Sequence, residues 1–468
     1  MARRLSLPHV PPQVLVAAGA ALYAAIVVTL VTLGQMKLGL SLLGALVFVP
    51  LAFVNPPLAL SVWLVTNLLA GIHFFGSASK RSLLVILLVW IGAVAAGGVK
   101  LLDTTSEAAR LRRRQVTLFL IFLLWVLLTL VWAPDSGFAS TVVGRLLMSG
   151  LVFSAVLTVV TEPRHVRYLA AAFVIGAVLS VLSGVVTGGL HTDASTASTL
   201  TSDEGRLRGG TSDPNYLAAA IVPAMMLAGA LAFRRRQPIV RFLLLIAAIV
   251  LAIGLAATES RGGFIAVVVV GIGALLVWRE RRLLIVAFMG VFIAGAAAFF
   301  IASPSAWQRV TSNTDKGSGR SDIWQVAWRI VETHPIAGVG LSQFPVVSPD
   351  YIRQPGALSR ADLLVNQHIV VHNSYLQLWA EAGIVGLLLF LAIALTGLQA
   401  CSAAARRFDA RGDPEMATMA RAALLALVGA LAASFFLSNI DDQRFWVLIG
   451  LGPALLVIAQ RDSRADAP

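Results

Sequence analysis

The chain has 468 residues, of which 58% are hydrophobic and 13% are charged, and its mean hydropathy is +0.85. This composition excludes an ordinary soluble domain and predicts an all-α integral membrane protein. The formal net charge of +13 lies largely in short breaks between apolar runs, where it faces an anionic leaflet, so we expect no nucleic-acid partner.

Apolar runs long enough to cross a bilayer recur along the whole chain. A helix needs about 20 mainly apolar residues to cross a hydrocarbon core of roughly 30 Å. Because the breaks at 35–37 and 55–57 are tight, we predict 12–14 transmembrane helices in a single polytopic domain, residues 1–468. The candidate runs are 13–34, 38–54, 57–76, 82–98, 115–133, 142–160, 167–188, 214–232, 240–258, 261–278, 282–301, 374–402, 418–438 and 443–460.

The basic residues predict the orientation of these helices. Placing Met1 in the cytoplasm puts the arginine-rich breaks at 110–114, 234–236 and 279–282 on the inner side, as the positive-inside rule requires. Both termini are then cytoplasmic. Lys80 and Arg81 are the exception, because this arrangement leaves them outside.

Two outward-facing segments are much longer than the others, at 189–213 and 302–373. Within the second, the stretch "GRSDIWQVAWRIVETHPIAGVG" (319–340) has apolar residues at helical spacing and ends in His334 and Pro335, which stop a helix. It predicts an amphipathic helix and a Gly-rich turn lying over the membrane mouth. This helix could serve only as a packed lid or could contact the substrate directly, and the sequence leaves both roles open.

The first long loop closes with "RLRGGTSDPNYLAAA" (206–220). Asp213 suits a helix N-cap and Pro214 the first helical position, so the free N–H groups of this helix point outward beside Arg206 and Arg208. A helix N-terminus with arginine is an anion site. Helix capping with arginines that reach lipid head groups is the alternative.

The next outward break is the short "TESRGG" (258–263), which places Arg261 at the outer membrane interface. Gly262 and Gly263 let another backbone or a head group approach closely. Arginine inside a membrane is usually functional, whereas interfacial arginine also serves as an anchor. Arg145, one turn into a predicted helix, is a weaker case of the same kind.

The stretch "VVHNSYLQLWAEAGIVG" (370–386) returns the chain to the membrane. Ser374 and Gln377 fit an S-x-x-Q capping box, which puts His372 and Asn373 just before the first helical turn. The positive end of the helix disfavours imidazolium, so His372 should be neutral and able to accept a proton near pH 7. His368 lies four residues earlier, but no third ligand accompanies the pair and no metal site is expected.

Together these motifs resemble a known family. "RLRGGTSDPN", "TESRGG", "GRSDIWQVAW…HPIAGVG" and "VHNSYLQLWAEAGIVG" follow one another between apolar runs as in the O-antigen ligase / O-antigen polymerase family of bacterial membrane glycosyltransferases. The resemblance implies a GT-C-like fold in the bacterial inner membrane, with its active site on the periplasmic face. It further implies an inverting transferase without cofactor or metal, whose donor is a glycan on undecaprenyl pyrophosphate and whose acceptor is lipid A-core or another glycan.

The resemblance also assigns residue roles. Arg206 and Arg261 match the arginines thought to hold pyrophosphate, with Arg208 and Arg145 as further candidates, and His372 matches the histidine thought to assist the acceptor hydroxyl. The residues expected to support them are Asp213, Asn215, Asn373 and Tyr375.

Several alternatives stay open at this stage. An O-antigen polymerase or a protein O-oligosaccharyltransferase has overlapping motifs, and a flippase or transporter of lipid-linked glycan would also have many spans. Ion-coupled transport usually marks itself with acids deep in the membrane. Glu381 is the one acid well inside a predicted outer-half helix, which counts against such coupling.

Overall fold

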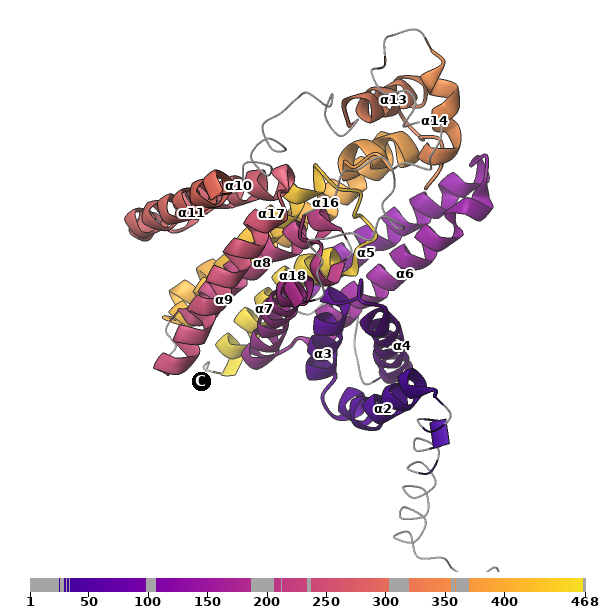
Figure 1. Ribbon diagram of the computed structural model, residues 1–468. Helices are drawn as coiled ribbons and strands as arrows, with labels where there is room; N and C mark the ends of the chain where they lie inside the picture. The colour runs from indigo at the N-terminus through magenta and orange to yellow at the C-terminus, as the bar shows by residue number, and fades with distance from the viewer. Residues whose placement is uncertain are drawn as a thin grey trace, which may run out of the picture.

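The computed structural model describes residues 34–97, 107–186, 206–211, 213–233, 237–302, 320–354 and 370–465, with single positions at 25, 29, 30, 32 and 358 (Figure 1). Every secondary-structure element in these ranges is a helix. Ten of the described helices are long and apolar enough to cross a membrane, and three more are apolar but shorter. The predicted all-α integral membrane fold is confirmed. Nearly all of the run 13–34 lies outside the described residues.

The helix bounds follow most of the predicted runs, with two corrections. Run 82–98 is wrong at its start, because the helix there is His73–Ala95. Run 57–76 is wrong at its end, because a turn at 69–72 separates a helix of 13 residues, too short to cross a bilayer alone, from the next one. The main helices are α2 (Met36–Val54), α3 (Pro56–Leu68), α4 (His73–Ala95), α5 (Glu107–Leu128), α6 (Ser136–Val159), α7 (Pro163–Val186), α8 (Pro214–Ala232), α9 (Pro238–Ala257), α10 (Arg261–Val277), α11 (Arg282–Ala302), α13 (Arg320–Thr333), α14 (Phe344–Ile352), α16 (Ser374–Ala410), α17 (Pro414–Ser434) and α18 (Gln443–Ala465).

The core of the bundle is built around α16, α17 and α18, which pack against α5, α6 and α8. Aromatic rings fill its centre: Trp446 of α18 lies edge-on to Phe119 at 4.9 Å between ring centroids. At the periphery, α11 leaves most of its apolar side chains exposed and α9 leaves one face exposed, as lipid-facing helices do. In Figure 1, α10 and α11 diverge from α8 and α9.

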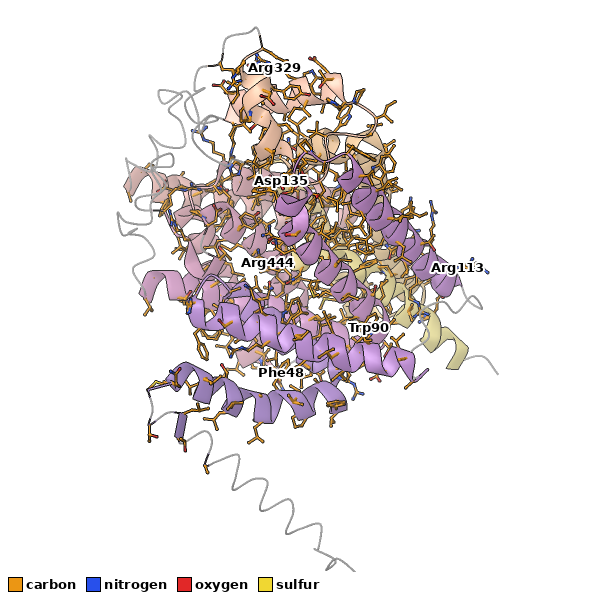
Figure 2. The ribbon with its side chains drawn as sticks, turned by 90° about the vertical axis from the view of Figure 1, so that its right-hand side faces the viewer. Phe48, Trp90, Arg113, Asp135, Arg329 and Arg444 are labelled. Carbon is orange, nitrogen blue, oxygen red and sulfur yellow. The ribbon has the colours of Figure 1, made fainter. Side chains whose placement is uncertain are left out.

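Helices α13 and α14 form a cap at one end of the bundle, and α2 lies at the other (Figure 1). Figure 2 follows this axis from Arg329 in the cap, past Asp135 and Arg444, to Trp90 and Phe48. The predicted amphipathic helix is α13, whose Val326 and Ile330 are completely buried in the cap's own apolar core. Arg329 closes the cap by donating from Nη1 to the carbonyl of Tyr351 at 2.7 Å.

A break in α16 joins the cap to the bundle. Gly383 adopts φ 68° and ψ −176°, so the helix stops after its first turns and restarts. The Gly-rich turn at 334–341 fills the break and bonds to the backbone on both sides of it. The hydrogen bonds run from the N–H of Val339 to the carbonyl of Ala380 (3.0 Å), from Gly340 to Glu381 (2.8 Å) and from Ile384 to Pro335 (2.9 Å). Backbone groups freed by the break are thereby satisfied.

Side chains complete this junction. Trp125 of α5 donates from Nε1 to the carbonyl of Ala382 at 2.7 Å, and Trp132 donates to the carbonyl of Gly338 at 3.0 Å. The fully buried carboxyl group of Glu381 accepts the N–H groups of Ser342 at 2.9 Å and of Phe344 at 3.3 Å. Glu381 therefore has a structural explanation, as the acceptor that fixes the entry to α14.

We predict that Gly383→Ala destabilises the fold strongly. A Cβ at this position would lie 1.9 Å from the carbonyl oxygen of Ile336, and the positive φ is unfavourable for any residue with a β-carbon. The free energy of unfolding should fall by on the order of 2 kcal/mol or more, measured by thermal unfolding in detergent with tryptophan fluorescence. The control is Gly144→Ala in α6, where a Cβ meets nothing within 4 Å and should be neutral or slightly stabilising. Equal melting temperatures for the two variants would contradict the prediction.

Candidate active site

The predicted first arginine motif lies along the C-terminal end of α9, just before α10 begins. The N–H of Leu207 donates to the carbonyl of Ala257 at 2.9 Å, and Arg206 donates from Nε to the carbonyl of Thr258 at 2.9 Å. Residues separated by about fifty positions in the chain are thus side by side. This contact brings Arg206 to the end of the bundle at which Arg261 begins α10.

Asn215 ties the two arginine motifs together. Its Oδ1 accepts a hydrogen bond from Nη2 of Arg206 at 3.3 Å and another from the Oγ of Ser260 at 2.8 Å. Ser260 is the N-cap of α10, and its Oγ in turn accepts the N–H of Gly263 at 3.2 Å. A residue expected only to support the site therefore links Arg206 to the helix that starts with Arg261.

Asp213 has the predicted capping role. Its carboxylate accepts the N–H groups of Asn215 at 2.7 Å and Tyr216 at 3.1 Å, and Pro214 follows at the first helical position of α8. The two glycines of "TESRGG" are closely approached, but by side chains rather than by the backbone or head group that the sequence predicts. A Cβ on Gly262 would lie 2.7 Å from the side chain of Phe436, so α10 packs here against the turn that follows α17.

The cap of α16 differs from the prediction. The N-cap is Asn373, whose Oδ1 accepts the N–H groups of Tyr375 and Leu376, both at 3.1 Å. The S-x-x-Q capping box is wrong because Ser374 is the first helical residue, and its Oγ donates to the carbonyl of Leu437 at 2.7 Å. Asparagine is itself among the strongest N-caps, so no box is needed. His372 still lies directly before the helix, as predicted.

Tyr375, predicted to support the site, packs at the start of α16. Its hydroxyl donates to the carbonyl of Leu431 at 2.7 Å, and its ring contacts Phe390 and Phe435. These contacts hold the first turn of α16 against α17.

His372 is half-buried and faces two charged groups. Burial, and then the positive charge of Arg320 at the start of α13, lower the pKa of His372 to about 4, while Asp213 acts in the opposite direction. The imidazole is therefore neutral at pH 7, as predicted. The main cause is desolvation, whereas the sequence argument relied on the helix end.

Arg320 connects His372 to the other arginines. Burial lowers the pKa of its guanidinium, and Arg206 and Arg261 lower it further, while Asp213 raises it. We call these five residues, Arg206, Asp213, Arg261, Arg320 and His372, the arginine–histidine cluster. Its three guanidinium groups and one carboxylate leave an excess of positive charge, and α8, α10, α13 and α16 all begin at it. Converging helix N-termini and arginines favour a multiply charged anion.

Sequence reasoning did not single out Arg320. It stands second in the quoted motif "GRSDIW", at the start of the amphipathic helix, so the same rule that selected Arg206 beside a helix start would have selected it. His368 lies outside the described residues.

Two of the predicted arginines are not brought to His372. Arg145 of α6 forms an ion pair with Asp441 at 2.8 Å, and 57% of its side chain is exposed. Burial raises the pKa of Asp441, and Arg145 opposes this shift. Arg208 lies half-buried near Arg206 but is not among the charges that shift the pKa of His372 or Arg320. Their phosphate-binding roles stay predictions.

The fold and cluster define a polytopic all-helical membrane protein with a cationic site at one end of its bundle. Residues 246–391 match the family model described as O-antigen ligase. The match supports assignment of the chain to the O-antigen ligase family, which is the resemblance its motifs predict. It includes Arg261, Arg320 and His372 and begins after Arg206. No curated protein matches the sequence.

We predict that the cluster binds pyrophosphate. Replacing Arg206, Arg261 or Arg320 by Gln removes a charge-assisted donor, which is worth about 1.5–3 kcal/mol, so each variant should bind inorganic pyrophosphate about tenfold more weakly or worse. Isothermal titration calorimetry of the purified protein measures the affinity. The matched control is Arg406→Gln, an exposed arginine of α16 bonded to Ser402. If the three cluster variants bound like this control, the anion site would be elsewhere.

Proposed function

We propose that the protein is a glycosyltransferase that moves a glycan from undecaprenyl pyrophosphate to an acceptor hydroxyl. We place the reaction at the extracytoplasmic face of the bacterial inner membrane, with lipid A-core or another glycan as acceptor. The O-antigen ligase match supports a transferase of this type. The family match leaves the donor, the acceptor and the face of the membrane open, and these parts belong to the proposal.

One observation supports this function more than any other: the arginine–histidine cluster combines an excess of positive charge with a neutral imidazole. A glycosyl pyrophosphate needs positive charge where its leaving group becomes more negative, and arginine forks with helix N-termini supply it. Its acceptor needs a group that takes up the hydroxyl proton. The cluster offers both within one electrostatic neighbourhood.

The proposed reaction is a single in-line displacement. The acceptor oxygen attacks the anomeric carbon while the bond from this carbon to the pyrophosphate oxygen breaks. The bonding electron pair leaves with undecaprenyl pyrophosphate, where Arg206, Arg261 and Arg320 stabilise it. The hydroxyl proton passes to the imidazole of His372 and then to solvent, and the configuration at the anomeric carbon is inverted.

A base with a pKa of about 4 is weak, but we expect the bound donor to raise the pKa of His372. Arg320 is the main charge that disfavours imidazolium in the free protein. A bound pyrophosphate places negative charge beside Arg320 and so favours the protonated imidazole. His372 therefore becomes a stronger base when the donor is in place, which makes proton transfer conditional on donor binding.

The first test of the proposal is removal of the base. His372→Ala should lower kcat about 10²- to 10⁴-fold, because that is the usual contribution of a general base. The measurement is product formation by purified protein with a polyprenyl-pyrophosphate glycan and an acceptor. His334→Ala, an exposed histidine in the cap bonded to Thr333, is the control and should keep wild-type activity. Unchanged turnover in His372→Ala would rule out the base.

The second test is the pH dependence. Because the free protein has a His372 pKa of about 4, kcat/KM should stay level near neutrality and fall only as the pH drops toward this value. The acid limb of kcat, which reports the donor complex, should lie at higher pH. In the free protein, the charges that face His372 are Arg320 from α13 and Asp213 from the head of α8. In the donor complex, the proposed pyrophosphate adds its negative charge to these two. Rate profiles from about pH 4 to about pH 8 measure this, and coincident limbs near 6.5 would contradict it.

Ligase, polymerase and protein O-oligosaccharyltransferase activities use the same donor chemistry. Mass analysis of lipid-linked and surface glycans in a deletion strain separates them. Long glycan accumulating on its carrier indicates a ligase, single unlinked repeats indicate a polymerase, and loss of glycan from protein indicates an oligosaccharyltransferase.

A flippase or ion-coupled transporter is less well supported. Glu381, the acid that such a reading would use, has both carboxyl oxygens occupied by the backbone of the 342–344 turn. In reconstituted vesicles without acceptor, movement of glycolipid across the bilayer would favour a flippase over the proposed transferase.

A further inference from the structure

The turn at 437–442, between α17 and α18, contacts both halves of the proposed active site through one residue. Ser438 accepts the N–H of His372 on its Oγ at 3.0 Å. Its carbonyl accepts the hydroxyl of Tyr216 at 2.5 Å. Tyr216 directly follows Asn215, which holds Arg206. Ser438 thus bridges the head of α16, where the base lies, and the head of α8, where the donor site lies.

His372 needs such a contact because its backbone is strained. Its φ of 54° is in the left-handed region, which is unfavourable for a residue with a β-carbon and persists only where neighbouring contacts enforce it. On the N-terminal side of His372, the carbonyl of Val371 accepts a hydrogen bond from Nε1 of Trp324 at 3.0 Å. On its C-terminal side, Asn373 caps α16. The N–H of His372 itself is held by Ser438.

The turn that carries Ser438 is firmly anchored. The N–H of Asn439 donates to the Oγ of Ser374 at 2.9 Å, and Trp446 donates from Nε1 to the carbonyl of Ile440 at 2.7 Å. The Oγ of Ser149 on α6 donates to the carbonyl of Asp441 at 2.8 Å. Contacts to α6, α16 and α18 therefore hold the turn in place, so it can impose a backbone conformation on its neighbour.

We propose that Ser438 is a positioning residue that holds His372 in its left-handed conformation and fixes it relative to the head of α8. This inference rests on the proposed function, because it concerns the same base. Ser438 acts through the backbone of His372 and through Tyr216, so it changes the geometry of proton transfer rather than the affinity for either substrate.

The test compares Ser438→Ala with Ser434→Ala. Ser434 is a buried serine one turn earlier in the chain whose Oγ donates to the carbonyl of Ala430 within α17. Ser438→Ala should lower kcat about tenfold or more with the KM of donor and acceptor changed less than about threefold, as expected for lost positioning. Ser438→Thr keeps the hydroxyl and should restore most of the rate. Ser434→Ala should match wild type. Equal kcat values for Ser438→Ala and Ser434→Ala would overturn the proposal.

Two further variants separate positioning from folding. His372→Gly removes both the imidazole and the strain, so it should melt at a higher temperature than His372→Ala while both lack activity.

Tyr216→Phe removes the other end of the bridge. The loss of kcat in Tyr216→Phe with Ser438→Ala should then be smaller than the product of the single losses. If the two losses of kcat multiplied, the bridge would be contradicted. If the two His372 variants melted at the same temperature, the strain would be contradicted.

The outcomes distinguish this inference from the proposed function. If His372→Ala keeps full turnover, His372 is not the base and the proposed mechanism fails, whatever Ser438 does. If His372→Ala is inactive while Ser438→Ala behaves like Ser434→Ala, the base stands and only its positioning by Ser438 is wrong.

Discussion

The insertion of the Gly-rich turn at 334–341 into the break of α16 is the constraint on which the rest of the structure depends. The turn supplies backbone partners for groups that the break at Gly383 leaves open, and it binds the cap to the bundle through them. An unpaired backbone group in an apolar setting costs free energy, so the break in α16 is stable only with the turn bound to it. The cap in turn sets where α13 begins, and so where Arg320 lies relative to His372. The electrostatics of the candidate site therefore depend on a junction formed by backbone hydrogen bonds.

The candidate site itself is an assembly of helix starts. Asp213, Ser260 and Asn373 each cap a helix with a side-chain oxygen, and the chain before each cap approaches the same end of the bundle. Capping by short polar side chains leaves the arginines available to act across elements: Arg206 and Arg261 both influence Arg320. Strain gathers here as well, because Glu259 and His372, each placed just before a cap, have positive φ. Strained residues held by several neighbours are typical of functional sites.

Not every polar group in an apolar protein marks chemistry. Glu381 is completely buried, yet its oxygens are engaged by backbone donors of the cap turn. Arg145, which the sequence ranks with the phosphate-binding arginines, is paired with Asp441 on the turn that also carries Ser438. Both residues make contacts that stabilise the fold. Arg206 also donates to a backbone carbonyl, that of Thr258, but it differs from them because it and Arg261 lie close enough to a third guanidinium, that of Arg320, to lower its pKa.

The sequence by itself determined the membrane class, most helix positions, the amphipathic α13 and the start of α8 with its Asp213 cap, because hydrophobic run length and capping chemistry are local properties. It also identified Arg206, Arg261 and His372 as candidates by residue type and neighbourhood. Only the tertiary structure decided that Asn373 rather than Ser374 caps α16, that Arg320 joins the cluster and that Arg145 pairs with Asp441. Each of these depends on contacts between residues far apart in the chain, and local pattern carries no information about which distant partner a polar side chain will meet.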